Sequence, residues 1–220
     1  MAKQKSHKKL RLLGGLVGII LILAGGYIAY ISFTTKDQSA PIAGQPRFAK
    51  QTVDPAKKTV TQKQAYSVPP SHPRELIIDK LGVDANILSM GLLGDTSLDA
   101  PKTAWDVGWY NKSALPGTDS GALLIDGHVN DALNQPGVFY KIATLSIGDE
   151  MKIQRGDNQV FTYRVVRVDQ TPLEKVDMTT MARSINPSKE GLNLITCGGI
   201  YDEARQTYDD RVLVYAERTS

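Results

Sequence analysis

Beyond about residue 74, short apolar and β-branched runs alternate with turn residues, which predicts a mostly β fold. The strongest pattern lies at residues 150–170, where apolar and polar positions alternate on both sides of an RGDN turn and predict a β-hairpin. Further strands are expected over residues 75–88 (in two pieces), 121–129, 191–197 and 211–218. Many short strands indicate a closed or nearly closed β-barrel, and about 145 residues are enough to bury one core.

Helical periodicity is scarce in the same part of the chain. A short helix is expected over residues 138–145, and a weaker helical pattern occurs at 178–183. No internal repeat is visible. The expected fold class therefore stays mostly β.

The N-terminal part of the chain has a different pattern. Leu12 to Phe33 are 22 residues without a charge, long enough to cross roughly 30 Å of hydrocarbon as one transmembrane helix. A cleaved signal peptide is the alternative, but its apolar core usually has only about 7 to 15 residues. Cations precede the segment, so the positive-inside rule predicts a cytoplasmic N-terminus and places the rest of the chain outside the cell membrane.

Residues 34–73 are polar and interrupted by prolines, which is typical of a flexible linker. His72, between Ser71 and Pro73, is interpreted as a solvated linker residue. The expected organisation is a basic tail, a transmembrane helix, a linker and a folded domain: residues 1–11, 12–33, 34–73 and 74–220.

The charge is concentrated in the basic tail. Of the 26 basic residues five lie in the first eleven positions, so the remaining 21 stand against 23 acidic residues. The rest of the chain is therefore near neutral and has no clustered basic face of the kind that binds nucleic acid.

Cys197 is the only cysteine in the chain and ends the apolar run NLITC. A single cysteine cannot form an intrachain disulfide. A lone cysteine at the end of a strand is most often a small buried apolar residue, so further residues are needed to support a catalytic role.

His128 and Arg211 supply that support. His128 ends the run ALLIDGH, and Arg211 opens the run RVLVYAE fourteen positions after Cys197. If the last two strands pair antiparallel, Cys197 and Arg211 lie side by side at one end of the barrel. A thiolate is a nucleophile for an amide carbonyl, an imidazole can protonate the departing amine, and a guanidinium can hold an oxyanion. Three scattered histidines and one cysteine provide no metal-ligand cluster.

At these residues the chain resembles the sortases, a family of membrane-anchored cysteine transpeptidases. The family signature TLxTC is matched by NLITC at residues 193–197, preceded by a GH pair at 127–128 and followed by the arginine of the next strand, Arg211. The resemblance covers roughly residues 74–218. The segments VGWY, GHVN, GVFYKI and LITCGG are most similar to class F or the related class E.

The resemblance implies an eight-stranded sortase barrel with short helices in the connections. Cys197 would attack the Thr carbonyl of an LPXTG-like sorting signal on a surface protein, His128 would act as general acid and base, and Arg211 would position the substrate and stabilise the oxyanion. An amine, on a peptidoglycan precursor or a pilin lysine, would then resolve the thioacyl-enzyme. Thr196 could add a contact to the substrate, and no cofactor is required.

Two positions depart from the family pattern. Asn193 stands where the signature has Thr, and it offers a polar side chain of similar reach. Asp126 stands two residues before His128, on the same face of an extended strand, where relatives often carry a small apolar residue. We hypothesise that the Asp126 carboxylate favours the imidazolium of His128 and orients its ring, the alternative being an exposed acid at a strand edge.

Other functions stay open. A pilus-polymerising sortase often has an Asp-Pro-aromatic lid, whereas Asp54-Pro55 is followed here by Ala56 and lysines, which favours attachment to the envelope. A hydrolytic cysteine peptidase would use water as the acceptor. A membrane-anchored β-barrel binding module would have a buried, unreactive cysteine.

Overall fold

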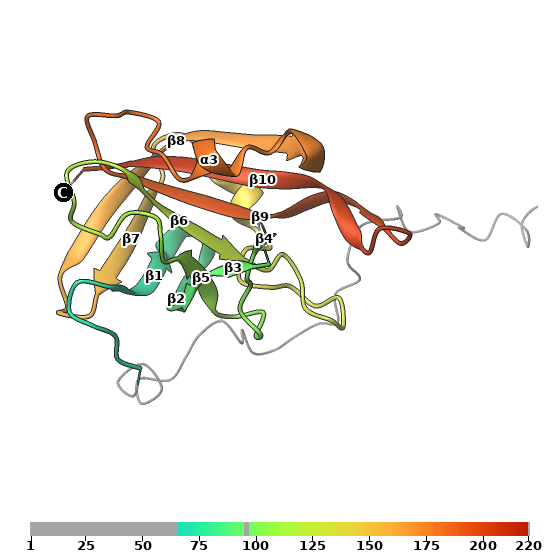
Figure 1. Cartoon of the computed structure of the whole chain (residues 1–220), viewed down its shortest axis with the longest axis horizontal. Helices are drawn as coiled ribbons and strands as arrows, with labels where there is room; N and C mark the ends of the chain where they lie inside the picture. The colour runs from blue at the N-terminus through green and yellow to red at the C-terminus, as the bar shows by residue number, and fades with distance from the viewer. Residues whose placement is uncertain (1–65, 95–96, 220) are drawn as a thin grey trace, which may run out of the picture. The chain divides into compact units, whose positions relative to one another are not determined.

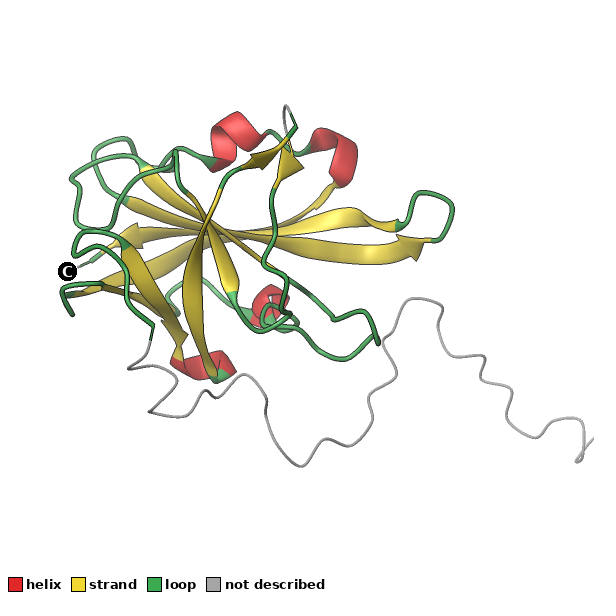
Figure 2. Cartoon of the chain, turned by 60° about the horizontal axis from the view of Figure 1, so that its bottom comes forward, coloured by secondary structure: helices red, strands yellow, loops and turns green. Residues whose placement is uncertain are grey.

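The computed structural model of the protein describes residues 66–94 and 97–219. In this part of the chain eight strands close into a barrel in the order β1-β2-β5-β6-β9-β10-β8-β7, as Figures 1 and 2 show. The barrel strands are β1 (Pro73–Ile78), β2 (Val83–Met90), β5 (Val107–Tyr110), β6 (Ala122–Gly127), β7 (Glu150–Arg155), β8 (Val160–Pro172), β9 (Gly191–Asp202) and β10 (Thr207–Arg218). The predicted eight-stranded barrel is confirmed.

The remaining elements are short and lie in the connections between barrel strands. They are the two-stranded sheet of β3 (Leu92–Leu93) and β4 (Ser97–Leu98), the 3₁₀ helices η1 (Asp79–Leu81), η2 (Ile142–Thr144) and η3 (Leu173–Lys175), and the helix α3 (Met178–Met181). None of the helices in the described ranges is long and apolar enough to cross a membrane.

The hairpin predicted at residues 150–170 is confirmed, because β7 and β8 pair antiparallel on either side of the RGDN turn. Of the short helix expected over 138–145, only Ile142–Thr144 is helical, as the 3₁₀ helix η2. Phe139 and Ile142 are fully buried in the barrel core. The turn before η2 and η2 itself direct these two side chains into the core. Packing in the core therefore decides the backbone conformation here, and the helical spacing of the apolar residues does not.

Alternating side chains of the strands divide between two apolar layers. Leu192, Leu194 and Val212 point into the barrel core, and each of the remaining six barrel strands also contributes residues to this core. The neighbouring positions on the outer face, such as Ile195 and Leu213, belong to a second cluster with Leu124, Met181 and Tyr215. The segment carrying η3 and α3 packs on this outer face through Val176 and Met178.

The described residues that precede β1 already contact the barrel. Gly156 N donates to His72 O at 3.0 Å, and Asp157 N donates to Pro70 O at 3.1 Å. The His72 ring packs edge to face on Trp109 with 5.4 Å between centroids, so this histidine is not a solvated linker residue. The predicted transmembrane helix, residues 12–33, and most of the predicted linker lie outside the described residues.

Candidate active site

Three strands bring Cys197, Arg211 and His128 to one end of the barrel. Cys197 on β9 is the direct register partner of Arg211 on β10, so the predicted pairing of these two residues is confirmed. β6 pairs with β9 in parallel, with Asp126 beside Ile195, and His128 follows β6 directly. All three positions share a face with outer-cluster residues, because side chains alternate along each strand.

The three residues line a groove of about 390 Å³. Its apolar walls continue the outer cluster, because the groove shares Leu98, Val176, Met178 and Ile195 with that cluster. Ser97, Ala100, Asp126, Gly127, Leu173 and Thr196 complete the lining. The groove is thus a gap in the outer apolar layer with a thiol, an imidazole and a guanidinium at its end.

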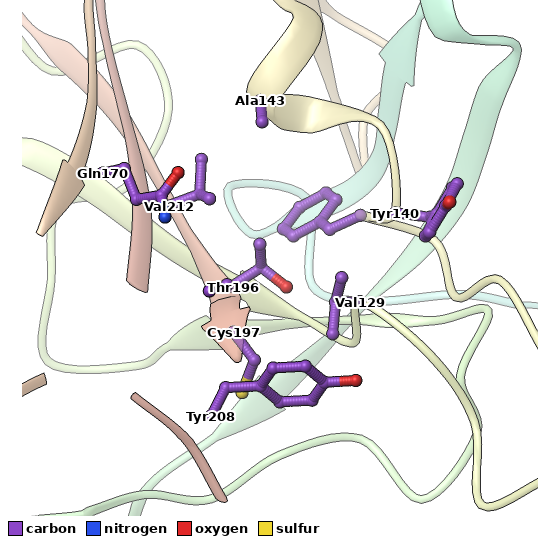
Figure 3. A pocket seen from close by; sticks show the side chains of 11 residues that line it. Val129, Tyr140, Ala143, Gln170, Thr196, Cys197, Tyr208 and Val212 are labelled. Atoms are coloured by element: carbon purple, nitrogen blue, oxygen red, sulfur yellow. The ribbon is translucent and has the colours of Figure 1, made fainter. Parts of the chain in front are cut away.

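Cys197 also lines a second, smaller cavity of about 190 Å³. Figure 3 shows this side cavity, with the Cys197 side chain beside the ring of Tyr208 and with Thr196 and Val129 close by. Its lining is mostly apolar and includes Phe139, Tyr140, Ala143, Gln170, Gly198, Gly199 and Val212. The nucleophile candidate therefore borders two separate spaces.

The Cys197 thiol is free and half-buried. Burial raises its pKa above the ordinary value, the Arg211 cation opposes that rise, and the Asp126 charge adds to it. The Arg211 guanidinium donates to Tyr208 O at 3.0 Å, to Asp210 O at 2.8 Å and to Thr207 Oγ1 at 3.2 Å. Within the described ranges it forms no ion pair with a carboxylate, so its charge is available to a ligand in the groove.

His128 is held by a residue from the loop after β4. Its Nε2 lies 2.8 Å from the carbonyl oxygen of Pro101. A carbonyl only accepts, so Nε2 carries the proton in the neutral ring and Nδ1 is the acceptor. The ring atom that can take up a further proton is therefore Nδ1.

Asp126 lies in the same groove but packs against Gly108, its register partner on β5. A Cβ added to Gly108 would lie 2.3 Å from Asp126 Oδ1, so any larger residue there would displace the Asp126 side chain. Burial raises the pKa of Asp126 to about 7, with a further contribution from the Asp99 charge. Since the hydrogen bond of His128 goes to Pro101, the hypothesis that Asp126 tunes His128 stays a prediction.

The two remaining predicted site residues make hydrogen bonds within the protein. The Thr196 hydroxyl is buried and donates to Gly127 O at 2.7 Å, which ties β9 to the end of β6 just before His128. Asn193 is fully buried and lines neither cavity. Its amide instead donates to Met181 O at the end of α3 and to Arg183 O just after it.

Two glycines follow Cys197 and let the strand bend. Gly199 has φ of +77°, and an added Cβ there would lie 2.1 Å from Asp209 Oδ1. That carboxylate oxygen accepts from Ile200 N at 2.6 Å. The bend directs the distal parts of β9 and β10 beyond the barrel as a two-stranded ribbon, visible in Figures 1 and 2. Glycines therefore follow Cys197 because the backbone bends immediately after this residue.

Sequence reasoning missed the walls of the groove and the partner of His128. Leu98, Pro101 and Val176 lie in short connections without apolar periodicity, so their place around the groove or beside His128 depends on how the loops fold over the barrel. The weak helical pattern at 178–183 was a partial signal, because α3 supplies Met178 to the groove. Within residues 66–94 and 97–219, no group of three His, Cys, Asp or Glu side chains is arranged to hold a metal ion.

Comparison with known proteins places the domain in a family. Residues 76–219 match the sortase domain family. No curated protein matches the chain. The fold is similar to that of sortase C-1 from Actinomyces oris, at 20% identity over 90% of this chain and 98% of that one, with a TM-score of 0.53. It is also similar to a lid mutant of sortase A from Corynebacterium diphtheriae, at 23% identity over 71% of this chain and 74% of that one, with a TM-score of 0.52.

Proposed function

The chain belongs to the sortase family, and we propose that it is a cysteine transpeptidase that cleaves an LPXTG-like sorting signal between Thr and Gly and transfers the acyl part to an amine. One observation carries the proposal. Cys197 and Arg211 are paired across β9 and β10, and His128 follows the parallel neighbour β6 at the same end of an apolar groove. A nucleophile, an acid–base group and a cation without a carboxylate partner among the described residues then line one groove where a peptide would bind.

In the first half-reaction the Cys197 thiol passes its proton to Nδ1 of His128, and the thiolate attacks the Thr carbonyl carbon. The carbonyl oxygen becomes an oxyanion next to the Arg211 guanidinium, which is free of carboxylate partners in the described structure. His128 then protonates the Gly nitrogen, the C–N bond breaks, and a thioester to Cys197 remains.

In the second half-reaction a neutral amine attacks the thioester carbonyl and loses its proton to His128. The tetrahedral intermediate collapses, the new amide leaves, and the Cys197 sulfur regains a proton. The thioester retains the energy of the cleaved amide for transfer, so the residues of this chain are sufficient for the step. Because burial raises the pKa of Cys197, the thiol predominates near neutral pH and the rate is expected to rise with pH.

The lining of the groove supports the sorting signal as the substrate. Leu98, Val176 and Ile195 present apolar surface beside Cys197, which suits the Leu and Pro of an LPXTG-like peptide. We further propose that the enzyme belongs to class F or the related class E, on the segments VGWY, GHVN, GVFYKI and LITCGG.

We place the enzyme on the outer side of the cell membrane, anchored by residues 12–33 with a cytoplasmic N-terminus. The support is the uncharged run of 22 residues after a basic tail. Its partners are then surface proteins with a sorting signal, and its acceptor is an amine of a peptidoglycan precursor or a pilin lysine. The absence of an aromatic residue directly after Asp54-Pro55 favours envelope attachment over pilus polymerisation.

The function is tested with the full-length chain in detergent, a set of LPXTG-like peptides and two amines, one resembling a peptidoglycan stem and one a pilin lysine. Mass spectrometry of the products is compared for wild type and Cys197→Ala. We expect a peptide cleaved after Thr and joined to one amine, absent in the variant.

Other outcomes select the alternatives. Cleavage without joining indicates a hydrolytic cysteine peptidase, and a preference for the lysine amine indicates a pilus-polymerising enzyme. No cleavage, together with a Cys197 that iodoacetamide labels only after unfolding, indicates a binding module.

Asp126 is part of the proposal as a residue that tunes His128. Its carboxyl lies in the groove and is placed two residues before the histidine on the same face of the strand. The pH–rate profiles of wild type and Asp126→Asn test this role. Superimposable profiles would end the hypothesis.

A further inference from the structure

Asn193 occupies a position in β9 that the proposed chemistry does not use. It lies four residues before Cys197 on the same outer face, and none of its surface is exposed. Its Nδ2 donates to Met181 O and to Arg183 O, each at 2.8 Å. Met181 is the last residue of α3 and Arg183 lies two residues beyond it, so the strand that carries the thiol also holds the end of this helix.

The hydrogen bonds fix the orientation of the Asn193 amide. Carbonyl oxygens only accept, so the NH₂ group must face Met181 and Arg183. The Oδ1 atom is then turned into a buried environment where it has no hydrogen-bond partner in the described structure. Since a buried unpaired oxygen is unfavourable, the two hydrogen bonds to the α3 end are the interactions that account for a polar residue here.

The segment held by Asn193 forms one wall of the groove. Leu173, Val176 and Met178 line the groove from this segment, and Met181 is buried in the outer cluster. The start of α3 is held separately, because the Asp177 carboxylate accepts from Thr179 N at 2.9 Å. α3 is only one turn long, so its position depends on such anchors rather than on its own hydrogen bonds.

We infer that Asn193 is a positioning residue: by binding the end of α3 it sets the distance between the Val176–Met178 wall and Ile195, and so decides how tightly the apolar residues of the sorting peptide fit. This inference rests on the proposed function. It assigns Asn193 no contact with the substrate and no part in proton transfer.

Two variants of the full-length chain distinguish the effect of losing the Asn193 hydrogen-bond donor from the effect of changing the side-chain volume. Asn193→Leu keeps the approximate volume without a donor, and Asn193→Thr keeps one donor. Asn186→Ala is the control, because Asn186 lies in the same connection. In the described part of the chain its side chain accepts an exposed hydrogen bond from Ser188 N and makes no hydrogen bond to α3. If Asn193→Leu fails to fold, Asn193→Thr alone carries the test.

Steady-state kinetics with an LPXTG-like peptide should show that the Asn193 variants change KM and not kcat. Losing the two hydrogen bonds should raise KM about tenfold in Asn193→Leu and by a smaller factor in Asn193→Thr. We expect kcat to stay within about twofold, because the groups that react are untouched. The preference for Leu over Ala at the apolar position of the peptide should fall with the rise in KM.

Two readouts without peptide complete the test. Iodoacetamide should label Cys197 at the wild-type rate in both variants, while amide hydrogen exchange over residues 173–183 should become faster. Faster exchange with unchanged KM and unchanged peptide preference would overturn the inference, as would an equal loss of kcat and labelling rate. If wild type itself processes no peptide, the proposed function fails first and this inference falls with it.

Discussion

Where β9 begins and β10 ends, the carboxylate of Glu190 is buried and hydrogen-bonded through both oxygens. Further along the same two strands, the side chains of Cys197 and Arg211 make no hydrogen bond to each other in the described structure. Glu190 accepts from the Tyr163 hydroxyl, from Gly117 N at 3.0 and 3.1 Å, and from Arg218 Nη1 at 2.8 Å. Its charge is thus balanced inside the protein. The Arg211 charge meets only backbone carbonyls and a hydroxyl.

The difference separates stability from function along one strand pair. Buried polar groups that are all paired hold β8, β9 and β10 together at the Glu190 end. At the Cys197 end, polar groups that face a groove keep part of their bonding capacity for a ligand. Loss of the Arg218 cation at the Glu190 end should therefore mainly change the free energy of unfolding, and loss of the Arg211 cation at the Cys197 end should mainly change the rate.

The largest effect is expected for Arg211→Ala. Losing the cation that faces the oxyanion in the proposed mechanism should lower kcat/KM about 10²- to 10³-fold. The free energy of unfolding should change by less than about 1 kcal/mol, because the lost hydrogen bonds are partly exposed. Peptide kinetics and urea unfolding of the same preparation check both values. A variant that loses stability in proportion to its activity would contradict the division between the two ends.

Arg218→Met tests the Glu190 end. Removing the cation leaves a buried carboxylate with fewer partners, so we expect a loss of about 3 kcal/mol in the free energy of unfolding. Burial already raises the pKa of Glu190, and the missing cation should raise it further. The kcat/KM of the folded enzyme should stay within about twofold. Lys152→Ala, which breaks an exposed pair with Asp79, is the control and should cost less than about 1 kcal/mol.

Asp126→Asn should produce a pH-dependent effect on stability. The folded protein keeps the Asp126 proton up to about pH 7, while the unfolded chain releases it near the ordinary pKa of 3.8. The unfolded state therefore binds fewer protons between these values, and the free energy of unfolding falls as pH rises. With allowance for solvent contact, the variant should be about 2 kcal/mol more stable than wild type at pH 8 and nearly equal at pH 4.

Thermal unfolding at the two pH values measures that difference. An equal gain at both would show that ionisation of Asp126 is not its cause. The same variant should also let Cys197 be alkylated at lower pH, because the Asp126 charge raises the pKa of the thiol.

The smallest effect is expected for Thr196→Val, which probes the hydrogen bond that joins β9 to Gly127. The isosteric change leaves a buried carbonyl without this donor and should cost about 1 kcal/mol in the free energy of unfolding. Because the bond lies next to His128, kcat should also fall a few-fold. Thr196→Ser keeps the donor and should restore kcat; a Ser variant as slow as Val would contradict the role of the hydroxyl.

The parts of the molecule that follow from local sequence could be predicted. The β7–β8 hairpin has clear alternation around a turn, and the pairing of Cys197 with Arg211 follows from two strands joined by a short connection. β5 was not predicted, because four residues are too few for a pattern. The barrel order places β6 between β5 and β9, a long-range arrangement that the residue pattern alone does not determine.

Side-chain partners at the site were the least predictable. The Pro101 carbonyl that holds His128 and the two carbonyls that bind Asn193 are backbone groups of irregular segments. Any residue type can present a carbonyl, so no sequence signal marks these partners. The residue types with distinctive chemistry were found, and the backbone groups that orient them were not.

The parallel pairing of β6 with β9 also bears on how such enzymes diverge. The strands that lead to His128 and Cys197 are joined by backbone hydrogen bonds, and most substitutions leave those bonds unchanged. Substitutions in the surrounding loops can then alter the groove while the register of the two strands stays the same. At only 20% identity this chain still has a fold similar to that of sortase C-1 from Actinomyces oris. In this chain the spacing of the two strands depends on backbone atoms, whereas the shape of the groove depends on side chains of the connections.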